Sequence, residues 1–296
     1  MMQGLCRVSF LSELWKTLGV CQSERAVEKV ESGKQAVVAI ESDRVTKVYG
    51  SCLGNICRQA WEREVGALTA FGAFQGQFIS IPSFKSSGYF DKPFTVGGMS
   101  FFASIEQERV FGSSFSYSFK EVLPKVGSAI GELHTRMNSV GPLNFSILDL
   151  IDTRLSIVMD KHSPNGHVLK PSDRKKLTKM VKPIADDRAA QRLVHGDMHP
   201  GNILVSRSDS RMAFLDFGNV GRSVPEQDVV FLAVCEQPVI RDVFKCYAKA
   251  TGGRLDKSRM MALFGLDLAV SAETAHRHGA EAEAKHMADM LQAVLG

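Results

Sequence analysis

The sequence has little of several features that would place a protein in a specialised class. Its 296 residues include only six cysteines, at positions 6, 21, 52, 57, 235 and 246. Because they form no CxxC pair and have no histidines at a matching spacing, neither a zinc site nor a thioredoxin-like motif is predicted. Reduced thiols in a cytosolic protein are the simpler interpretation.

Long apolar runs and strong charge are also missing. No run approaches the roughly 18 residues that a membrane-spanning helix needs, and residues 1–20 lack the apolar core and small-residue cleavage site of a secretory signal. The net charge is +4, and the one basic cluster, DRKKLTK at 173–179, suits a solvated helix face. We therefore expect a cytoplasmic protein with no membrane span and no nucleic-acid partner.

The hydrophobic patterning at the start of the chain is strand-like. Residues 25–50 combine β-branched residues with two turn candidates, ESGK and ESDR, and predict three antiparallel strands. Residues 55–74 carry apolar residues at the spacing of one helical face. Strand-like pieces at 78–84 and 99–106 return to the sheet, and residues 83–98 between them are predicted to form a flexible loop.

Beyond residue 110 the pattern becomes helical. Residues 118–137 and 171–187 are predicted helices, the second with Ser172 as its N-cap, and residues 226–295 are helical again. The predicted fold class is α+β, and a hydrophobic share of 44% is enough to bury its core. The predicted divisions are an N-terminal extension (1–24), a strand-rich N-lobe (25–110) and a helix-rich C-lobe (111–296).

Polar residues gather in two loops that follow apolar strands. LVHGDMHPGNILV at 193–205 places Asp197 and Asn202 between two apolar runs, and FLDFGNVG places Asp216 at the end of another. Carboxylate and carboxamide oxygens are ligands that magnesium accepts, and a carboxylate can orient an attacking hydroxyl. The D-x-x-x-x-N spacing is the one used when the aspartate meets the hydroxyl and the asparagine reaches the metal. These residues predict phosphoryl transfer from a nucleotide.

HGDMHPGN followed by LDFG resembles the catalytic core of the aminoglycoside phosphotransferase and choline kinase group, within the protein-kinase-like superfamily. The resemblance implies a two-lobed protein-kinase-like fold that uses ATP and Mg²⁺. It implies that Asp197 is catalytic, that Asn202 and Asp216 hold the metal, and that His195 buttresses the loop. Asp228, in EQDVVFLAV, is either the family's buried acid that braces this loop or a residue stabilised at a helix N-terminus.

The resemblance also requires a lysine that contacts the α and β phosphates and pairs with a helical glutamate. RVTKVYG supplies Lys47, and AWEREVGAL offers Glu62 and Glu64. We prefer Glu64, because the family's acid directly precedes an apolar run, as in REVGAL. A G-x-G-x-x-G phosphate loop is missing, and only Gly33 stands near the expected turn, where backbone amides could still cap the phosphates.

Two features favour a small-molecule hydroxyl acceptor over a peptide. Gly196 stands where ordinary protein kinases carry an arginine that binds an activation-loop phosphate, and no APE-like element follows the LDFG segment. The predicted function is therefore an ATP-dependent phosphotransferase. The alternatives are an atypical protein kinase that phosphorylates serine or threonine of a partner, and a pseudokinase that binds nucleotide without turnover.

The acceptor itself is not identified by the sequence, because the helical C-terminal region that forms the acceptor pocket in this fold varies with function. Several acidic residues there could meet a cationic acceptor, although surface charge is the favoured interpretation. They are Glu226, Asp267, Glu273 and Glu281.

Overall fold

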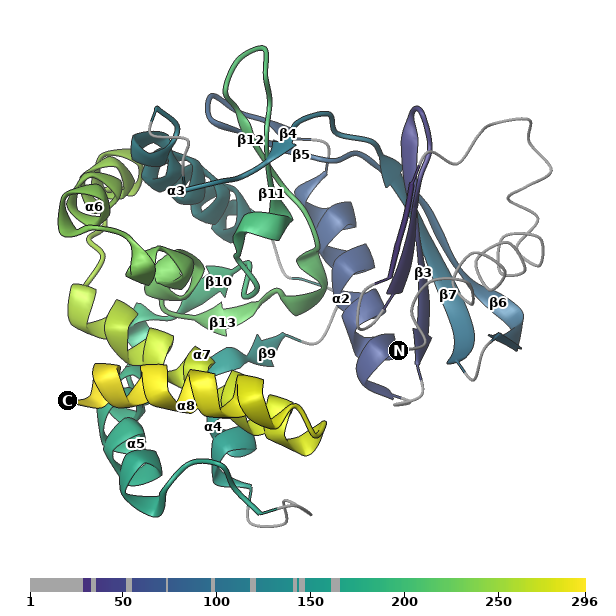
Figure 1. The fold of residues 1–296 in the computed structure, drawn as a ribbon. Helices are drawn as coiled ribbons and strands as arrows, with labels where there is room; N and C mark the ends of the chain where they lie inside the picture. Colours follow the sequence, from purple (N-terminus) through teal and green to yellow (C-terminus); the bar gives the residue numbers. More distant parts are fainter. Residues whose placement is uncertain are drawn as a thin grey trace.

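The chain folds into a sheet-rich part and a helix-rich part, with one helix between them (Figure 1). The computed structural model describes residues 29–32, 36–51, 55–72, 74–96, 99–117, 121–140, 143, 147–160 and 166–296. The predicted N-terminal extension and Gly33 lie outside these residues. The α+β fold class is confirmed, whereas the division near residue 110 stays a prediction.

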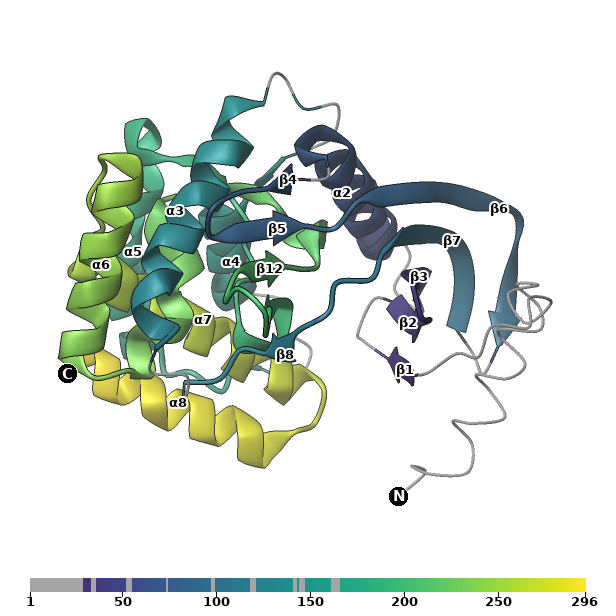
Figure 2. The ribbon, with the colours of Figure 1, turned by 90° about the horizontal axis from the view of Figure 1, so that it is seen from above.

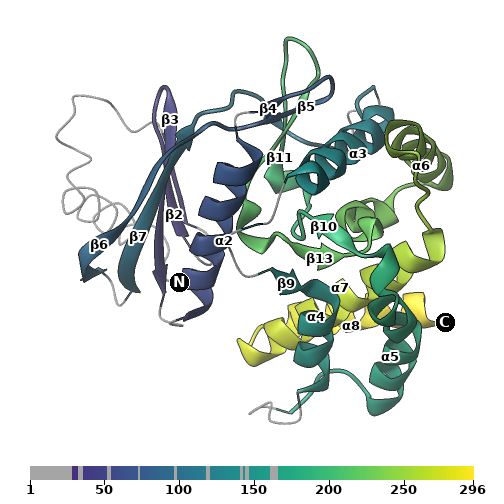
Figure 3. The same cartoon turned by 180° about the vertical axis from the view of Figure 1, so that it is seen from behind.

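The N-terminal sheet contains five antiparallel strands. In spatial order they are β1 (Lys29–Ser32), β2 (Ala36–Ile40), β3 (Arg44–Ser51), β7 (Met99–Glu108) and β6 (Phe84–Val96). Helix α2 (Asn55–Phe71) packs against β3, β7 and β6, as seen from behind in Figure 3. Apolar residues of α2, including Ala60, Leu68 and Phe71, are buried, which confirms the predicted helical face. The three predicted strands between residues 25 and 50 are also confirmed.

The predicted flexible loop at 83–98 is wrong, because most of it forms strand β6. Its glycine, aspartate and proline resemble turn residues, but β6 lies at the edge of the sheet, where a proline does not interrupt a ladder on both sides. The register with β7 is irregular between Tyr89 and Phe94, around Pro93. Tyr89 also packs on Trp61 of α2, with ring centroids 4.3 Å apart. Tertiary pairing therefore overrides the local turn signal.

A second sheet joins segments from before and after residue 110. Its strands, in spatial order, are β4 (Phe74–Gln75), β5 (Ile79–Ile81), β12 (Met212–Phe214), β11 (Ile203–Val205) and β8 (Ser113–Ser114). Figure 2 shows β5 beside β12, with which it pairs in parallel. Because β11 begins directly after Asn202 and β12 ends just before Asp216, one short antiparallel pair fixes both of these residues.

A third small sheet holds the other ends of the same two loops. Strand β10 (Arg192–Val194) ends directly before His195 and pairs with β13 (Gly221–Ser223), which in turn pairs with β9 (Leu148–Asp149). A 3₁₀ turn, Phe217–Asn219, lies between β12 and β13. Both polar loops are therefore tied to sheets at each end.

Most of the remaining described elements are helices, including two short 3₁₀ turns, Arg188–Ala190 and Pro200–Asn202. The longer helices are α3 (Leu123–Ser139), α4 (Leu150–Met159), α5 (Pro171–Asp186), the 3₁₀ helix Pro225–Val234, α6 (Gln237–Thr251), α7 (Lys257–Arg277) and α8 (Glu281–Leu295). Helix α3 packs on α6, and α7 packs on α8. No helix in the described ranges is both long and apolar enough to cross a membrane.

The predicted N-cap of α5 is wrong. The helix begins at Pro171, so Lys170 occupies the N-cap position, and its side chain makes no capping hydrogen bond. Proline at the first helical position is already set for the helix, because its ring fixes φ and it has no N–H to satisfy. The Ser172 hydroxyl instead lies 3.3 Å from the carboxylate of Asp173.

Candidate functional site

The centre of the site is Lys47, whose ammonium group lies between two carboxylates. Lys47 Nζ is 2.7 Å from Glu64 Oε1 and 3.3 Å from Asp216 Oδ1. Strand β3 supplies the lysine and α2 supplies Glu64. Asp216 is the second residue after the end of β12. The Tyr49 hydroxyl also donates to Glu64. Glu62, the other helical acid considered from the sequence, instead meets Arg58 and Tyr89 on the exposed side of α2.

Burial and charge act in opposite directions on these three groups. The Lys47 side chain is 9% exposed and that of Glu64 is fully buried. Burial lowers the pKa of Lys47, but the charges of Glu64 and Asp216 raise it more, so the net pKa is raised and the ammonium stays charged. Burial raises the pKa of Glu64, whereas the Lys47 charge lowers the pKa of Asp216.

Asp216 is held in a backbone conformation that few residues adopt. Its φ is +63°, in the left-handed region, which is uncommon for a residue with a Cβ. The next residue, Phe217, is fully buried and packs edge-on against Phe71 of α2, with centroids 5.7 Å apart. The Arg63 side chain donates to the carbonyl oxygen of Gly218 at 2.8 Å. Helix α2 therefore positions both Glu64 and the segment that carries Asp216.

Residues 195–202, predicted from the sequence to be the catalytic loop and called so below, present Asp197 and Asn202 together. Asn202 Nδ2 donates to the backbone oxygen of Asp197 at 2.9 Å, and Leu215 N donates to the backbone oxygen of Asn202 at 2.9 Å. Asn219 Nδ2 donates to Asp197 Oδ2 at 3.1 Å. Sequence reasoning missed Asn219, although it directly follows the LDFG motif, because no motif assigns it a role.

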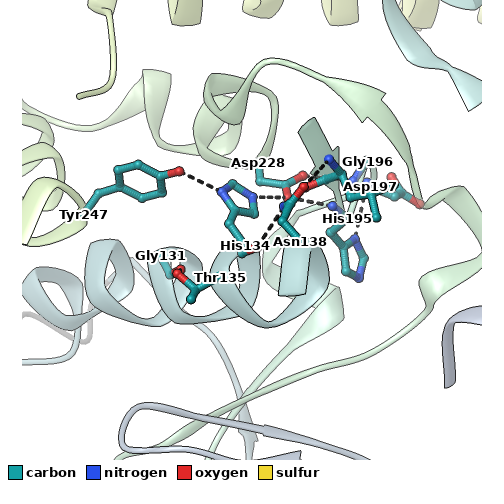
Figure 4. A network of polar contacts seen from close by, with 10 residues as sticks. Gly131, His134, Thr135, Asn138, His195, Gly196, Asp197, Asp228 and Tyr247 are labelled. Carbon is teal, nitrogen blue, oxygen red and sulfur yellow. Dashed lines mark hydrogen bonds and ion pairs between the residues drawn. The ribbon is translucent and has the colours of Figure 1, made fainter. Parts of the chain in front are cut away.

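Asp228 is the buried brace of this loop. Its Oδ2 accepts from His195 N at 2.7 Å and its Oδ1 accepts from Gly196 N at 2.9 Å, while His134 Nε2 lies 2.8 Å from Oδ2 (Figure 4). Burial alone raises the pKa of Asp228, but its hydrogen bonds and the neighbouring histidines hold the pKa below its ordinary value. Of the two roles considered for Asp228, the geometry favours the buried brace.

The two histidines near Asp228 have defined hydrogen-bonding roles. His134 Nδ1 is 3.0 Å from the Tyr247 hydroxyl, so a single line of contacts runs from α6 through α3 to the loop (Figure 4). His195 Nε2 donates to the Leu215 carbonyl at 2.8 Å, which leaves Nδ1 to accept from Asp197 N at 3.4 Å. His195 therefore supports the loop from within the core.

Gly196 has no room for a side chain. Its φ is +82°, and a Cβ there would overlap the backbone oxygen of Asn219 and lie 2.8 Å from Leu150 Cδ1. Its carbonyl accepts from Arg154 Nη2 of α4 at 2.8 Å. Glycine at this position is therefore required by close packing of two loops, in addition to leaving no arginine for a phosphorylated activation loop.

One cavity of about 390 Å³ lies between the two larger sheets. Apolar side chains from both sides line it, including Val38, Val45, Leu204 and Leu215, and so do Lys47, Asn202 and Asp216. The connection after β7 closes another part of its wall. Apolar walls suit the base of a nucleotide, and the charged and polar side chains suit its phosphates. Gly33, predicted to lie near the phosphates, is outside the described residues.

A second cavity of about 340 Å³ lies on the other side of the catalytic loop, and Asp197 and His199 line it. Its remaining wall is mainly apolar, with Phe231 and Phe264, but it includes Asp267 of α7. Asp267 Oδ1 is 3.1 Å from Arg154 Nη1, and burial raises the pKa of Asp267. Sequence reasoning did not select Arg154, and it favoured surface charge for Asp267.

Surface charge is wrong for two further acids of the C-terminal region. Glu226 is 2% exposed and accepts a hydrogen bond from the backbone N–H of Asp256, which is the N-cap residue of α7. Glu273 is fully buried, accepts from Leu169 N at 3.3 Å and lies 3.2 Å from His167. Both carboxylates hold backbone or side-chain partners inside the helix-rich part of the chain, a role that hydropathy cannot reveal. Glu281, in contrast, has an exposed side chain beside His276.

The described residues include no group of three or more histidine, cysteine, aspartate or glutamate side chains arranged to hold a metal alone. Asn202 and Asp216 nevertheless line the same cavity. Asn202 Nδ2 donates to the backbone oxygen of Asp197, so the side-chain oxygen Oδ1 of Asn202 is the atom that can bind a metal. One carboxylate and one carboxamide oxygen suit Mg²⁺, which binds few protein ligands and completes its shell with phosphates and water.

Solved structures with the same fold are phosphotransferases and kinases of small molecules by name. The GDP complex of an aminoglycoside 2'-phosphotransferase has a TM-score of 0.69 and 17% identity, with 96% of this chain and 98% of that chain covered. A choline/ethanolamine kinase family protein from Mesorhizobium loti has a TM-score of 0.67, 14% identity, and coverage of 97% and 95%. An aminoglycoside phosphotransferase from Streptomyces rimosus, bound to ADP and streptomycin, has a TM-score of 0.58, 16% identity, and coverage of 87% and 98%.

The sequence also matches the model of the phosphotransferase enzyme family over residues 108–259, just over half of the chain. The chain therefore belongs to this family, and the predicted protein-kinase-like fold and enzyme class, a kinase, are confirmed. The matched residues include Asp197, Asn202 and Asp216. A comparison with curated protein sequences found no match.

Proposed function

We propose that this protein transfers the γ-phosphate of ATP to a hydroxyl group of a small-molecule acceptor, with the help of Mg²⁺. The observation that carries the proposal is the position of Lys47, which lines one cavity and lies between Glu64 and Asp216, with Asp197 at the adjoining cavity. An ion pair this buried is costly unless further partners share it, and phosphate oxygens are such partners.

Lys47 would bind the α and β phosphates, and Glu64 would fix the direction of its ammonium group. The raised pKa of Lys47 supports this role, because the group is fully charged when it meets phosphate. Tyr49 in turn holds Glu64, so the lysine is positioned by a chain of hydrogen bonds from β3 and α2. Backbone amides near Gly33 are proposed to cap the phosphates.

Asn202 and Asp216 would hold the metal. When bound, Mg²⁺ neutralises charge on the phosphate oxygens and so lowers the barrier to transfer. The left-handed backbone of Asp216 and the Lys47 contact to its Oδ1 hold this carboxylate at the cavity wall. The hydrogen bond from Asn202 to Asp197 links the metal ligand to the catalytic aspartate within one loop.

Asp197 would orient the acceptor hydroxyl and take its proton. The hydroxyl oxygen forms a new bond to the γ-phosphorus, the bond from that phosphorus to the β–γ bridging oxygen breaks, and ADP leaves with the electron pair. The hydroxyl proton passes to the Asp197 carboxylate and then to solvent. Because the transition state is loose, Asp197 contributes mainly by positioning the nucleophile.

Two observations support a small-molecule acceptor. Only strand β13 separates the 3₁₀ turn after Asp216 from the helix that begins at Pro225, so this part of the chain has no long peptide-binding segment. The cavity beside Asp197 has mainly apolar walls and the Arg154–Asp267 pair, which suits a compact molecule. Structures with this fold are named for aminoglycosides and choline or ethanolamine as acceptors. A cytoplasmic location, where ATP is available, belongs to the proposal.

A screen of ATP consumption over hydroxylated metabolites and antibiotics tests the proposal. The wild type should consume ATP in the presence of Mg²⁺ and particular acceptors, and Asp197→Ala should lower the rate at least about 100-fold. Asp186→Ala, which changes an exposed aspartate of α5, is the matched control and should keep the wild-type rate.

Two outcomes would contradict the proposal. Radiolabel that enters proteins of a lysate and no metabolite would identify a protein kinase. A nucleotide-dependent rise in melting temperature without ATP consumption by any acceptor would identify a pseudokinase.

A further inference from the structure

The carboxylate of Asp197 has one side-chain donor within the part of the chain that the structure describes. Asn219 Nδ2 donates to Asp197 Oδ2 at 3.1 Å. Asn202, the other asparagine nearby, donates to the backbone oxygen of Asp197 and leaves the carboxylate alone. The two asparagines therefore hold different parts of the same residue.

Asn219 is itself fixed against the catalytic loop. It ends the 3₁₀ turn Phe217–Asn219, where Val220 N donates to the Phe217 carbonyl at 3.2 Å. Its backbone oxygen fills the space in which a Cβ of residue 196 would stand, so glycine at 196 and the position of Asn219 depend on each other. Arg63 of α2 holds the preceding carbonyl, that of Gly218. The side-chain amide of Asn219 is therefore presented to Asp197 from a rigid backbone.

A fixed donor on one carboxylate oxygen has a direct chemical effect. A free carboxylate rotates about its terminal bond, so the oxygen that must meet the acceptor hydroxyl has no defined direction. A hydrogen bond to Oδ2 selects one orientation and leaves Oδ1 as the oxygen for the hydroxyl. Misplacement of a reacting group by about 1 Å is enough to lower a rate 100-fold.

We propose that Asn219 is a positioning residue that orients the Asp197 carboxylate for phosphoryl transfer. The inference rests on the proposed function of Asp197. It also connects the two halves of the site, because Asn219 lies three residues after Asp216, a proposed metal ligand, in one continuous turn. Any shift of the segment that carries the metal ligand changes the donor on Asp197.

Asn219→Ala and Asn219→Asp separate a positioning role from a packing role. The alanine variant removes the donor, whereas the aspartate variant keeps the shape of the side chain but places a second negative charge beside Asp197. The probe reaction is Mg²⁺-dependent ATP hydrolysis with water as the acceptor, measured as kcat and KM. Nucleotide binding is measured separately as the rise in melting temperature caused by ADP.

We expect kcat to fall about 10-fold in Asn219→Ala and at least about 100-fold in Asn219→Asp at neutral pH. KM for ATP and the ADP-dependent rise in melting temperature should stay within about twofold of wild type, because Asn219 does not line the nucleotide cavity. In Asn219→Asp, activity relative to wild type should increase as the pH falls toward 5, since the introduced carboxyl becomes a donor when it is protonated.

The matched control is Asn138→Ala on α3. Asn138 exchanges hydrogen bonds with the backbone of Leu193 and donates to the His134 carbonyl, and it does not contact Asp197. Its loss should lower the melting temperature and leave kcat per folded molecule unchanged. This control shows how much of any rate change comes from stability alone.

A kcat of Asn219→Ala within twofold of wild type would overturn the positioning role, as would Asn219→Asp being more active than Asn219→Ala at neutral pH. A wild-type protein without ATP turnover, even with the acceptor library, would overturn the proposed function and this role with it. Normal turnover in both the wild type and the variants would overturn the role alone.

Discussion

Replacing Asp228 with asparagine tests the brace beneath the catalytic loop. The carboxylate accepts from the backbone N–H groups of His195 and Gly196 and from His134, and all of its contacts are buried. An asparagine side chain offers one oxygen and one NH₂ group, so at least one of these donors faces another donor. The remaining hydrogen bonds lose the strength that a charged acceptor gives them.

The loss of stability caused by Asp228→Asn can be estimated from these contacts. A hydrogen bond to a charged group contributes about 1.5–3 kcal/mol, and a buried donor without a partner costs about 1–3 kcal/mol. We expect Asp228→Asn to lower the free energy of unfolding by about 3 kcal/mol. At about 2 °C or more per kcal/mol for a chain of this size, the melting temperature should fall by roughly 6 °C.

Urea and thermal unfolding followed by circular dichroism measure this difference. Asp186→Asn is the matched control, because its side chain is 61% exposed and, among the residues that the structure describes, pairs with Lys182 on the same helix. Its effect should stay within about 0.5 kcal/mol. An Asp228→Asn protein as stable as this control would refute the role of Asp228 as a brace.

The same variant has a pH signature. The pKa of Asp228 in the folded protein lies below its ordinary value of 3.8. Its contribution to stability is therefore complete above pH 3.8 and is lost as the pH falls below that value toward the folded pKa. The stability difference between wild type and Asp228→Asn should shrink over this acid range, and a difference that is constant with pH would contradict the reasoning.

Three further changes have defined outcomes. Gly196→Ala must adopt φ = +82°, and its Cβ would overlap a backbone oxygen, so its free energy of unfolding should fall by at least about 2 kcal/mol and most ATP turnover should be lost. The control Gly252→Ala, at φ = +71° with open space around it, should lower the free energy of unfolding by only about 1 kcal/mol in the same urea assay. Glu64→Gln removes one of two carboxylates on Lys47, and kcat/KM for ATP should fall at least about 10-fold in a coupled assay; an unchanged value would contradict the ion pair's role. Burial raises the pKa of Tyr247 to about 12, so stability should fall as the pH rises from about 10 to about 12, and Tyr247→Phe should remove this fall in alkaline unfolding measurements.

Local sequence patterns predicted the strands and helices whose hydrophobic residues repeat at a strand-like or helical spacing. The alternation before residue 50 and the helical spacing of α2 correspond to confirmed elements, because burial on one face imposes those periods. The motif selected Asp216 and the family resemblance selected Lys47 and Glu64, and the fold brings these three residues into contact. Their roles in the reaction stay predictions that the proposed experiments address.

Tertiary contacts decided what local patterns could not. Strand β6 has a turn-like composition and is held by its pairing with β7. Asn219, Arg154 and Asp267 contact the catalytic loop or line its cavity, yet each comes from a different element and none belongs to a recognised motif. Long-range proximity of this kind is fixed by packing, so a single sequence does not reveal it.

Asp197 is proposed to act in phosphoryl transfer from ATP. The most direct test is single-turnover transfer of radiolabelled γ-phosphate to an acceptor found in the screen, with wild type and Asp197→Asn compared at equal folded concentration. The rate should be at least about 100-fold lower in the variant, with ADP binding unchanged. A variant that transfers phosphate at nearly the wild-type rate would contradict it.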